Sequence, residues 1–416
     1  MSTLWKSNKV EHRAQQAITR LLKARNKNGW PVSIQNHIDF YGLCGCAKPD
    51  KLDFVMVMEV LSKMKEKGLS SVSQFEQTFN DLTHAAKTQK KYQWTSFIPL
   101  RLEWLDDLNI GQITLFGTTF KFHLSNYAEK TIGKDNFKDI LRDLRISTKW
   151  QIKDLPNCWL TCKTSNVDFI QSWKDIGYSL YAIRSLIELS TCGFTFKHSW
   201  PFQPRFSLPF PLYIICISDV GHRDFYYFPK LYEESKEKPF KISSKAWTWV
   251  KDNARKLKSP LKDNSIELLI ANALRLYSQS LDDIASNLCL LSLWQMAETI
   301  TLSQNFGGQT EKVCNRLALF GKMLKGVDSL ILKDALSVIS HNRNEIVHSG
   351  RDSDVDQRMI HILQMTCTLG LLWLLGHEKN LKTIDHLELY YQYNSQNNAN
   401  IQSLKEVIRF IEKTRK

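Results

Sequence analysis

The 416-residue sequence has no run of about 18 uninterrupted apolar residues, the length that a membrane-spanning helix needs. The apolar stretch at Thr366–Gly376 is too short for that role. The opening segment, MSTLWKSNKVEHRAQQ, also lacks the apolar core of a signal peptide. These absences favour a cytoplasmic protein that does not enter a membrane.

The chain holds nine cysteines, and they are scattered. An odd number of scattered cysteines argues against a disulfide framework. Cys44, Cys46, Cys158 and Cys162 could supply four thiolates to zinc. Their spacings do not match those of a zinc ribbon, and the two pairs lie more than a hundred residues apart. We therefore favour small buried core residues at these positions and predict no cofactor.

Motifs for metal-dependent chemistry are incomplete. No glycine precedes Gly321-Lys322 at the distance that a phosphate-binding P-loop requires. The stretch Asp352–Gln357 begins like a calcium-binding loop, but Gln357 and Leu363 stand where the glycine and glutamate should be. Its acids are better interpreted as charges of a first helical turn.

The motif of a restriction-type nuclease site is loosely matched by Asp224, Glu234 and Lys236. The last two lie in a charged run with no strand pattern, so we give this metal-dependent alternative a low weight.

The charge is strongly basic and uneven. The net charge is +14, and residues 1–100 hold 15 lysines and arginines against 8 acidic residues. Such an excess favours a polyanionic partner through phosphate contacts. The first 28 residues are typical of a basic helix, with cationic side chains at Arg13, Arg20, Lys23, Arg25 and Lys27.

Periodicity divides the rest of the first 260 residues between helices and strands. Helices are expected at 51–67, 73–90, 135–144 and 168–189. Strands are expected within 111–124, at 157–163, and as a pair joined at 220–222. The Lys-rich segment 229–263 is the best linker candidate.

From residue 264 onward the pattern indicates only long helices, at 264–279, 280–304, 311–324, 328–350 and 353–377. Ser280, with Asp283 three residues on, Asp328 and Gly350 supply the cap signals. Short connections imply antiparallel neighbours in a bundle. The sequence thus predicts an α+β protein: a mixed region over 1–260, divided near 92–150 if it holds two subdomains, a helical bundle over 264–390, and a helical tail over 391–416.

The stretch VISHNRNEIVHSG places a permanent cation on the apolar side of the helix at 328–350. At 100° per residue, Arg343 lies within about 60° of five apolar residues. They are Leu332, Leu336, Ile339, Ile346 and Val347. A guanidinium buried without a partner costs several kcal/mol, so Arg343 must face an acid or a cleft.

His348 follows five residues later and adds a group that carries protons at neutral pH. A fixed cation and an imidazole together suit a phosphodiester, whose oxygens need a cation and whose cleavage moves protons. The simpler interpretation is structural: Arg343 pairs with a core carboxylate, and Glu298 on the expected helix at 280–304 is the candidate.

The segment Arg343-Asn344-Glu345-Ile346-Val347-His348 matches R-x(4–6)-H with a polar residue after the arginine. None of the other histidines has an arginine five to seven positions before it. In this helical context the segment resembles the HEPN superfamily, and the helices around it look most like the Apea-type domains of bacterial defence proteins. The resemblance covers about 264–390; residues 1–260 match no family that we recognise.

This resemblance implies a metal-independent endoribonuclease that works as a homodimer, because one chain carries only one motif and two chains together complete the site. Arg343 would bind the scissile phosphate, His348 would be the acid/base, and Asn344 would orient the site. Attack by the 2′-hydroxyl of RNA would give a 2′,3′-cyclic phosphate and a 5′-hydroxyl end. It also suggests antiviral defence or abortive infection, with control by an activating ligand or partner.

A non-catalytic RNA-binding or protein-interaction module is the alternative, because basic charge and the twelve tryptophans fit that function equally well. The Arg343 and Asn344 pattern favours catalysis, since a purely structural domain does not need both an arginine and a histidine at this spacing.

Overall fold

The fold is that of a computed structural model of the chain. The residues that it describes are 4–26, 33–47, 54–88, 91–100, 102–104, 111–124, 126–148, 158–166, 169–195, 213–221, 223–227, 240–282, 286–302, 310–323, 326–349, 355–394, 401–403 and 405–409. The chain folds into two compact units, Met1–Lys91 and Tyr92–Lys416. The combination of helices with an antiparallel sheet confirms the α+β class.

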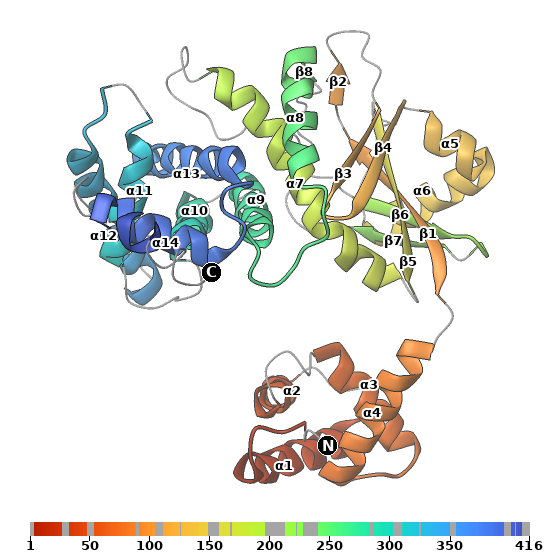
Figure 1. The fold of residues 1–416 in the computed structure, drawn as a ribbon. Helices are drawn as coiled ribbons and strands as arrows, with labels where there is room; N and C mark the ends of the chain where they lie inside the picture. Colours follow the sequence, from red (N-terminus) through yellow and green to blue (C-terminus); the bar gives the residue numbers. More distant parts are fainter. Residues whose placement is uncertain are drawn as a thin grey trace. The chain divides into compact units, whose positions relative to one another are not determined.

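The first unit consists of helices packed around one apolar core (Figure 1). They are α1 (Asn8–Ala24), α2 (Ile34–Cys46), α3 (Phe54–Glu66) and α4 (Val72–Thr88). Two of its arginines make hydrogen bonds within the unit. Arg20 donates two hydrogen bonds to the Asp39 carboxylate, at 2.9 and 2.6 Å, and Arg25 donates to the Ser62 carbonyl at 3.0 Å. Arg13 and Lys23 remain exposed on α1.

The second unit begins with an antiparallel sheet in the order β3-β4-β5-β1-β6-β7. Its strands are β1 (Tyr92–Leu100), β3 (Gln112–Leu115), β4 (Thr118–Leu124), β5 (Cys158–Asn166), β6 (Tyr213–Ser218) and β7 (Arg223–Tyr227). Phe116 and Gly117 join β3 to β4 with positive φ angles of 49° and 85°. Two such residues make a two-residue hairpin turn that follows the twist of the strands.

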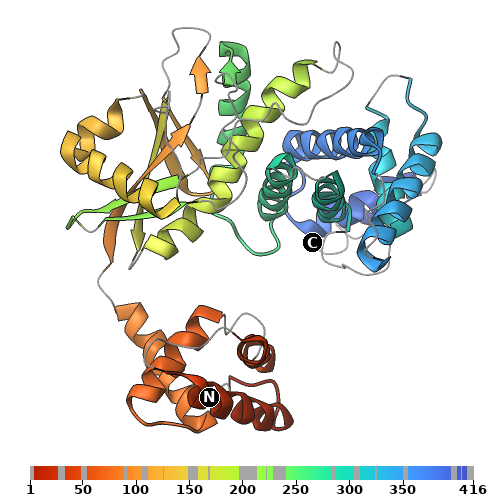
Figure 2. The same ribbon diagram turned by 180° about the vertical axis from the view of Figure 1, so that it is seen from behind.

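Helices cover both faces of this sheet (Figure 2). The long helix α7 (Phe169–Thr195) covers the face that bears Ile98, Leu160 and Ile214. The opposite face, with Trp159, packs against α6 (Lys134–Thr148). The short helix α5 (Tyr127–Ile132) lies beside α6 on that side. Residues of β5 point alternately to the two cores, as the two-residue period of a strand requires.

The thiols of Cys158 and Cys162 are buried, as predicted, and burial raises the pKa of Cys158 to about 12. Cys44 and Cys46, for which we also expected burial, are only half-buried and pack against the core of the first compact unit.

The expected linker at 229–263 proves to contain regular structure. Strand β8 (Phe240–Ile242) pairs in parallel with β2 (Leu102–Trp104), and helix α8 (Ser244–Lys256) follows. Trp247 of α8 is fully buried and meets the Phe122 ring edge-on at 4.9 Å. Lys245, Lys251 and Lys256 belong to this amphipathic helix, whose buried residues recur at helical spacing, while residues 229–239 lie outside the described part of the chain.

The C-terminal part of the second unit is a bundle of helices. Its helices are α9 (Ile266–Asp282), α10 (Ser286–Leu302), α11 (Thr310–Gly321), α12 (Ser329–Ser349), α13 (Gln357–His377) and α14 (Ile384–Asn394). One cap and one helix start differ from the prediction. Helix α9 runs through Ser280, so Ser280 caps nothing, and α13 is capped by the Asp356 side chain, which accepts from the Arg358 N–H at 2.9 Å. The tail is helical at 401–403 and 405–409.

Helix α13 is long and apolar enough to cross a membrane by length and composition, but 61% of its most apolar window is buried inside the unit. Its buried side chains belong to the common core of the bundle, as in the central helix of a water-soluble bundle.

The bundle is joined to the sheet region through α7. Arg184 of α7, which is buried, donates hydrogen bonds to the carbonyl and hydroxyl oxygens of Ser278 at 3.2 and 3.1 Å. The Ser185 hydroxyl donates to the Leu274 carbonyl at 2.7 Å. The boundary between the two compact units therefore lies at residue 91. The sequence pattern had suggested a boundary at 260–264, where mixed helices and strands give way to helices only.

A close approach of helices predicts how the bundle responds to one added methyl group. A Cβ atom at Gly370 of α13 would lie 2.8 Å from Ile300 Cδ1 and 2.9 Å from Phe320 Cε2. We expect Gly370→Ala to lower the free energy of unfolding by about 1–3 kcal/mol through overpacking. Gly376→Ala on the same helix meets nothing within 4 Å and should be neutral or stabilise by up to about 1 kcal/mol. Urea unfolding measures both; equal effects would contradict the packing.

A second prediction concerns acid stability. Glu388 of α14 accepts hydrogen bonds from Arg316 of α11, and these bonds lower its pKa from 4.5 to about 2. A lowered pKa stabilises the fold above pH 4.5, and this stabilisation is lost as the pH falls toward 2. The wild type should therefore be more stable than Glu388→Gln at pH 6, and the difference should shrink toward pH 2. Urea midpoints test this, with the exposed Glu311→Gln as control; a difference independent of pH would contradict it.

Candidate functional site

Helix α12 is fixed at its start and along one side. The Asp328 carboxylate accepts from the Leu330 and Ile331 N–H groups at 2.7 and 3.3 Å, which confirms Asp328 as the N-cap. Leu332, Leu336 and Ile339 are buried in the core, as the sequence stripe predicts. Ile346 is half-buried and packs against the same core, whereas Val347 is exposed. The apolar stripe therefore ends before the last turn of the helix.

Arg343 faces α10 at the edge of this stripe. Its Nη2 lies 3.6 Å from Glu298 Oε1, and the two side chains are 25% and 26% exposed. Trp294, one turn earlier on α10, donates from Nε1 to Glu298 Oε1 at 2.9 Å and so fixes the carboxylate. The structure thus brings together Arg343 and Glu298, which sequence reasoning had paired. It also adds Trp294, whose role could have been suspected from the four-residue spacing to Glu298.

The hydrogen-bonding capacity of Arg343 is only partly used. Nη1 donates to Asn344 Oδ1 at 2.9 Å, but Nε is buried and finds no partner among the residues that the structure describes. A distance of 3.6 Å to Glu298 is an ion pair without a well-formed hydrogen bond. A guanidinium carries five N–H donors in a rigid fork. Arg343 is therefore a positioned cation with donors still available to an anion.

His348 lies on a different side of α12. Five residues of α-helix turn by about 140° and rise by about 7.5 Å, so His348 does not stand beside Arg343 within one chain. Its side chain is exposed and makes no hydrogen bond or ion pair to the described part of the chain. The imidazole is consequently free to exchange protons with a ligand. The four named residues do not form one closed cluster: Arg343, Asn344 and Glu298 are together, and His348 is apart.

A second imidazole shares the His348 side of the helix. His341 precedes His348 by seven residues, close to two full turns, and its Nε2 lies 3.5 Å from Glu345 Oε1. Both residues are exposed, so this pair is weak. His341 carries no sequence signal of its own, because no arginine precedes it at the motif spacing.

The structure describes only some of the residues of the metal-dependent alternative and of the predicted caps. Asp224 lies on β7 opposite Cys216, while Glu234, Lys236 and the predicted cap Gly350 fall outside the described residues. Among the described residues, no group of three histidine, cysteine or acidic side chains is arranged to hold a metal ion.

The Arg343–Glu298 pair can be tested as a structural element. Both side chains are a quarter exposed and their separation is long, so we expect a coupling free energy below about 1 kcal/mol. The measurement is a double-mutant cycle of Arg343→Met, Glu298→Gln and the double variant in urea unfolding. A coupling of 3 kcal/mol or more, the order of magnitude for a buried pair, would show that Arg343 is mainly a structural clamp.

The site therefore consists of a partly unsatisfied guanidinium held by α10 and α12, an amide beside it, and an exposed imidazole one and a half turns further along α12. Such a set can bind an anion and move a proton. Comparisons of the chain with protein-family models, with curated proteins and with solved structures found no match.

Proposed function

We propose that the protein is a metal-independent endoribonuclease of the HEPN type, acting in the cytoplasm. The observation that carries this proposal is the incomplete satisfaction of Arg343, whose Nε is buried without a partner and whose contact with Glu298 is long. Buried donors of this kind cost free energy, and they are expected where a ligand supplies the missing acceptors. The R-x(4–6)-H motif adds His348 as the proton carrier.

In the proposed reaction, the guanidinium of Arg343 binds the non-bridging oxygens of the scissile phosphate and stabilises the charge that develops there. Asn344 orients Arg343 through the 2.9 Å hydrogen bond from Nη1 to Oδ1. Glu298, fixed by Trp294, holds the guanidinium from the opposite side. The 2′-hydroxyl of the RNA attacks the phosphorus, the P–O5′ bond breaks, and protons pass from the nucleophile and to the leaving oxygen. His348 is the acid/base group for one of these transfers.

A second copy of the chain completes this site in the proposal. Because His348 is turned by about 140° from Arg343, one phosphate cannot easily contact both side chains of the same helix. Helix α12 also exposes apolar side chains, with Ile331 70% and Val338 54% accessible. Ile331, Val338 and His348 lie on one side of α12 at spacings of seven and ten residues. An exposed apolar stripe that leads to His348 suits a contact between two α12 helices.

We propose that the first unit either recruits RNA or restrains the nuclease. Residues 1–100 carry half of the chain's excess positive charge, and Arg13 and Lys23 are exposed on α1. Long-range attraction of RNA phosphates needs charges of this kind. An unrestrained ribonuclease would damage its own cell, so an activating ligand or partner and a role in antiviral defence or abortive infection belong to the proposal.

A second candidate function is a non-catalytic RNA-binding or protein-interaction module. The observation that favours it is the Arg343–Glu298 ion pair, because a structural arginine would be paired in the same way. The two functions differ in what they require of His348, which no structural contact explains within the described part of the chain.

The decisive test is cleavage of an end-labelled RNA in excess EDTA. Wild-type protein should give 2′,3′-cyclic phosphate and 5′-hydroxyl ends. Arg343→Ala and His348→Ala should each reduce the rate by about a hundredfold or more, the usual contribution of an electrostatic or acid–base group. An RNA with a 2′-deoxy or 2′-O-methyl group at the cleaved position should resist.

Matched controls separate chemistry from charge. His341→Ala removes an exposed imidazole from the same side of α12, and Arg255→Ala removes an exposed guanidinium on α8. Both should retain activity. Cleavage that survives both motif substitutions, or that EDTA abolishes, would overturn the proposal; RNA binding without cleavage, unchanged in His348→Ala, would favour the module.

The dimer is tested separately. Val338→Asp places a charge on the exposed stripe without touching the core, so folding should be preserved. Two aspartates facing each other would repel, and we expect the variant to be monomeric in sedimentation and its cleavage rate to fall at least tenfold. Ser337→Asp, at an exposed position one residue earlier, is the control. A monomeric wild type with full activity would contradict the shared site.

A further inference from the structure

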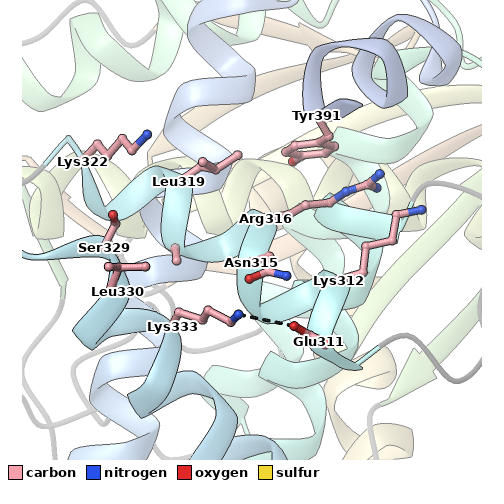
Figure 3. Close-up of a pocket in the computed structure, with 11 residues that line it drawn as sticks. Glu311, Lys312, Asn315, Arg316, Leu319, Lys322, Ser329, Leu330, Lys333 and Tyr391 are labelled. Atoms are coloured by element: carbon pink, nitrogen blue, oxygen red, sulfur yellow. Dashed lines mark hydrogen bonds and ion pairs between the residues drawn. The ribbon is translucent and has the colours of Figure 1, made fainter. Parts of the chain in front are cut away.

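A cavity of about 560 Å³ lies along α11, between the first turn of α12 and Tyr391 of α14 (Figure 3). Its size falls within the range of about 300–1,000 Å³ that is typical of sites for small molecules. The cavity is lined by Glu311, Lys312, Asn315, Arg316, Ala318, Leu319, Lys322, Ser329, Leu330, Lys333 and Tyr391. None of these residues belongs to the Arg343 site.

The lining is cationic. Four of its side chains are positively charged, namely Lys312, Arg316, Lys322 and Lys333, while Glu311 is its one acid. A second carboxylate, Glu388, reaches Arg316 and Lys312. The four cations and the two carboxylates, Glu311 and Glu388, therefore leave a net charge of +2. A concave surface with such an excess attracts anions.

The cations differ in how firmly they are engaged. The buried Arg316 donates two hydrogen bonds to Glu388 and another to the Thr301 carbonyl, and its guanidinium lies 4.6 Å from the centre of the Tyr391 ring. These contacts hold the Arg316 side chain in place in the lining of the cavity. Lys333 pairs with Glu311 at 3.3 Å, but Glu311 is 80% exposed, so water competes for this contact. Lys322 has no acidic partner among the described residues.

The available cations come from two neighbouring segments of the lining. Figure 3 shows Lys322, from the turn after α11, and Ser329 on one side of the cavity, and Lys333 of α12 below them with its amine directed toward Glu311. The N–H groups of Leu330 and Ile331 are occupied by Asp328, so side chains rather than the helix terminus must recognise an anion there. Leu319 and Leu330 supply apolar surface beside these lysines, and Leu330 is 71% exposed although it is apolar.

We propose that this cavity binds a phosphate ester of nucleotide size, with its phosphates at Lys322, Ser329 and Lys333 and its apolar part against Leu319 and Leu330. Lysine binds phosphate as a point charge, and a phosphate can displace the exposed Glu311 from Lys333. The volume of this open cavity, which is lined by three helices, fits a compact ligand rather than a continuous RNA strand. This site is independent of the proposed cleavage reaction.

The experiment is isothermal titration calorimetry of the full chain with adenosine triphosphate, inorganic pyrophosphate and adenosine. We expect saturable binding of adenosine triphosphate at one molecule per chain, weaker binding of pyrophosphate and weakest binding of adenosine. Lys322→Ala and Lys333→Ala should each weaken binding of the triphosphate about tenfold, because each removes one charge-assisted contact.

Two further variants separate the cavity from general surface charge. Asn315→Trp fills the cavity from an exposed position and keeps every lysine, so it should abolish binding while its thermal unfolding stays cooperative. Lys379→Ala removes an exposed lysine outside the cavity and should bind like the wild type. Arg343→Ala should also bind normally, which keeps this result separate from any result on RNA cleavage.

Several results would overturn the assignment. They are the absence of binding to either phosphate compound, unchanged binding in Asn315→Trp, and equal losses in Lys379→Ala and Lys322→Ala. A fourth is binding of a 2′-O-methyl RNA ten-mer alone, lost in Lys322→Ala and Lys333→Ala, which would identify the cavity as part of an RNA path instead.

Discussion

The burial of Arg184 in the long helix α7 is the constraint that makes the sheet and the bundle one unit. A guanidinium keeps its charge at any working pH, so it can be buried only where acceptors are fixed around it. Ser278 of α9 provides two of them, and the Ser185–Leu274 hydrogen bond repeats the connection one residue later. Because α7 covers the sheet with its other side, the position of α9, the first helix of the bundle, is set by the sheet region.

Two arginines of the bundle, the buried Arg316 and the partly exposed Arg343, differ in how completely their donors are satisfied. Arg316 has a bidentate carboxylate, a carbonyl and an aromatic face, which is a complete set of partners. Arg343 has a long contact with Glu298, a hydrogen bond to the neighbouring Asn344 and an unsatisfied Nε. A residue kept only for stability would be expected to resemble Arg316. The difference between the two supports a ligand-binding role for Arg343 without reference to any motif.

Sequence patterns predicted most helices of the bundle and the β3–β4, β5 and β6–β7 strands, because these segments have clear periods. The central strand β1 was missed, since Pro99 argues against an interior strand. The structure resolves the conflict: β6 pairs with β1 only from Trp94 to Phe97, so the missing N–H of Pro99 is not needed on that side. Helix α2 was missed as well; Gly42 and Gly45 weaken its pattern.

For the site, the sequence could place Arg343 and Glu298 on facing sides of two helices, because that inference needs only helical periodicity. It could not reveal the cavity along α11. The lysines of that cavity come from α11, the turn after it and the start of α12, and no single period connects them. Sites assembled from several elements depend on which helices become neighbours, and this is decided by tertiary packing.

Helix α12 connects the features argued above. Its first turn supplies Ser329 and Leu330 to the cavity and Ile331 to the exposed stripe, and its last turns carry Arg343 and His348. A ligand against Leu330 would fix the turn that begins the stripe, so the proposed ligand and the proposed contact between two chains would share one segment. Any free energy that couples them must act in both directions, since a ligand that favours the dimer binds the dimer more tightly. The start of α12 is thus where control of a shared site would be exerted.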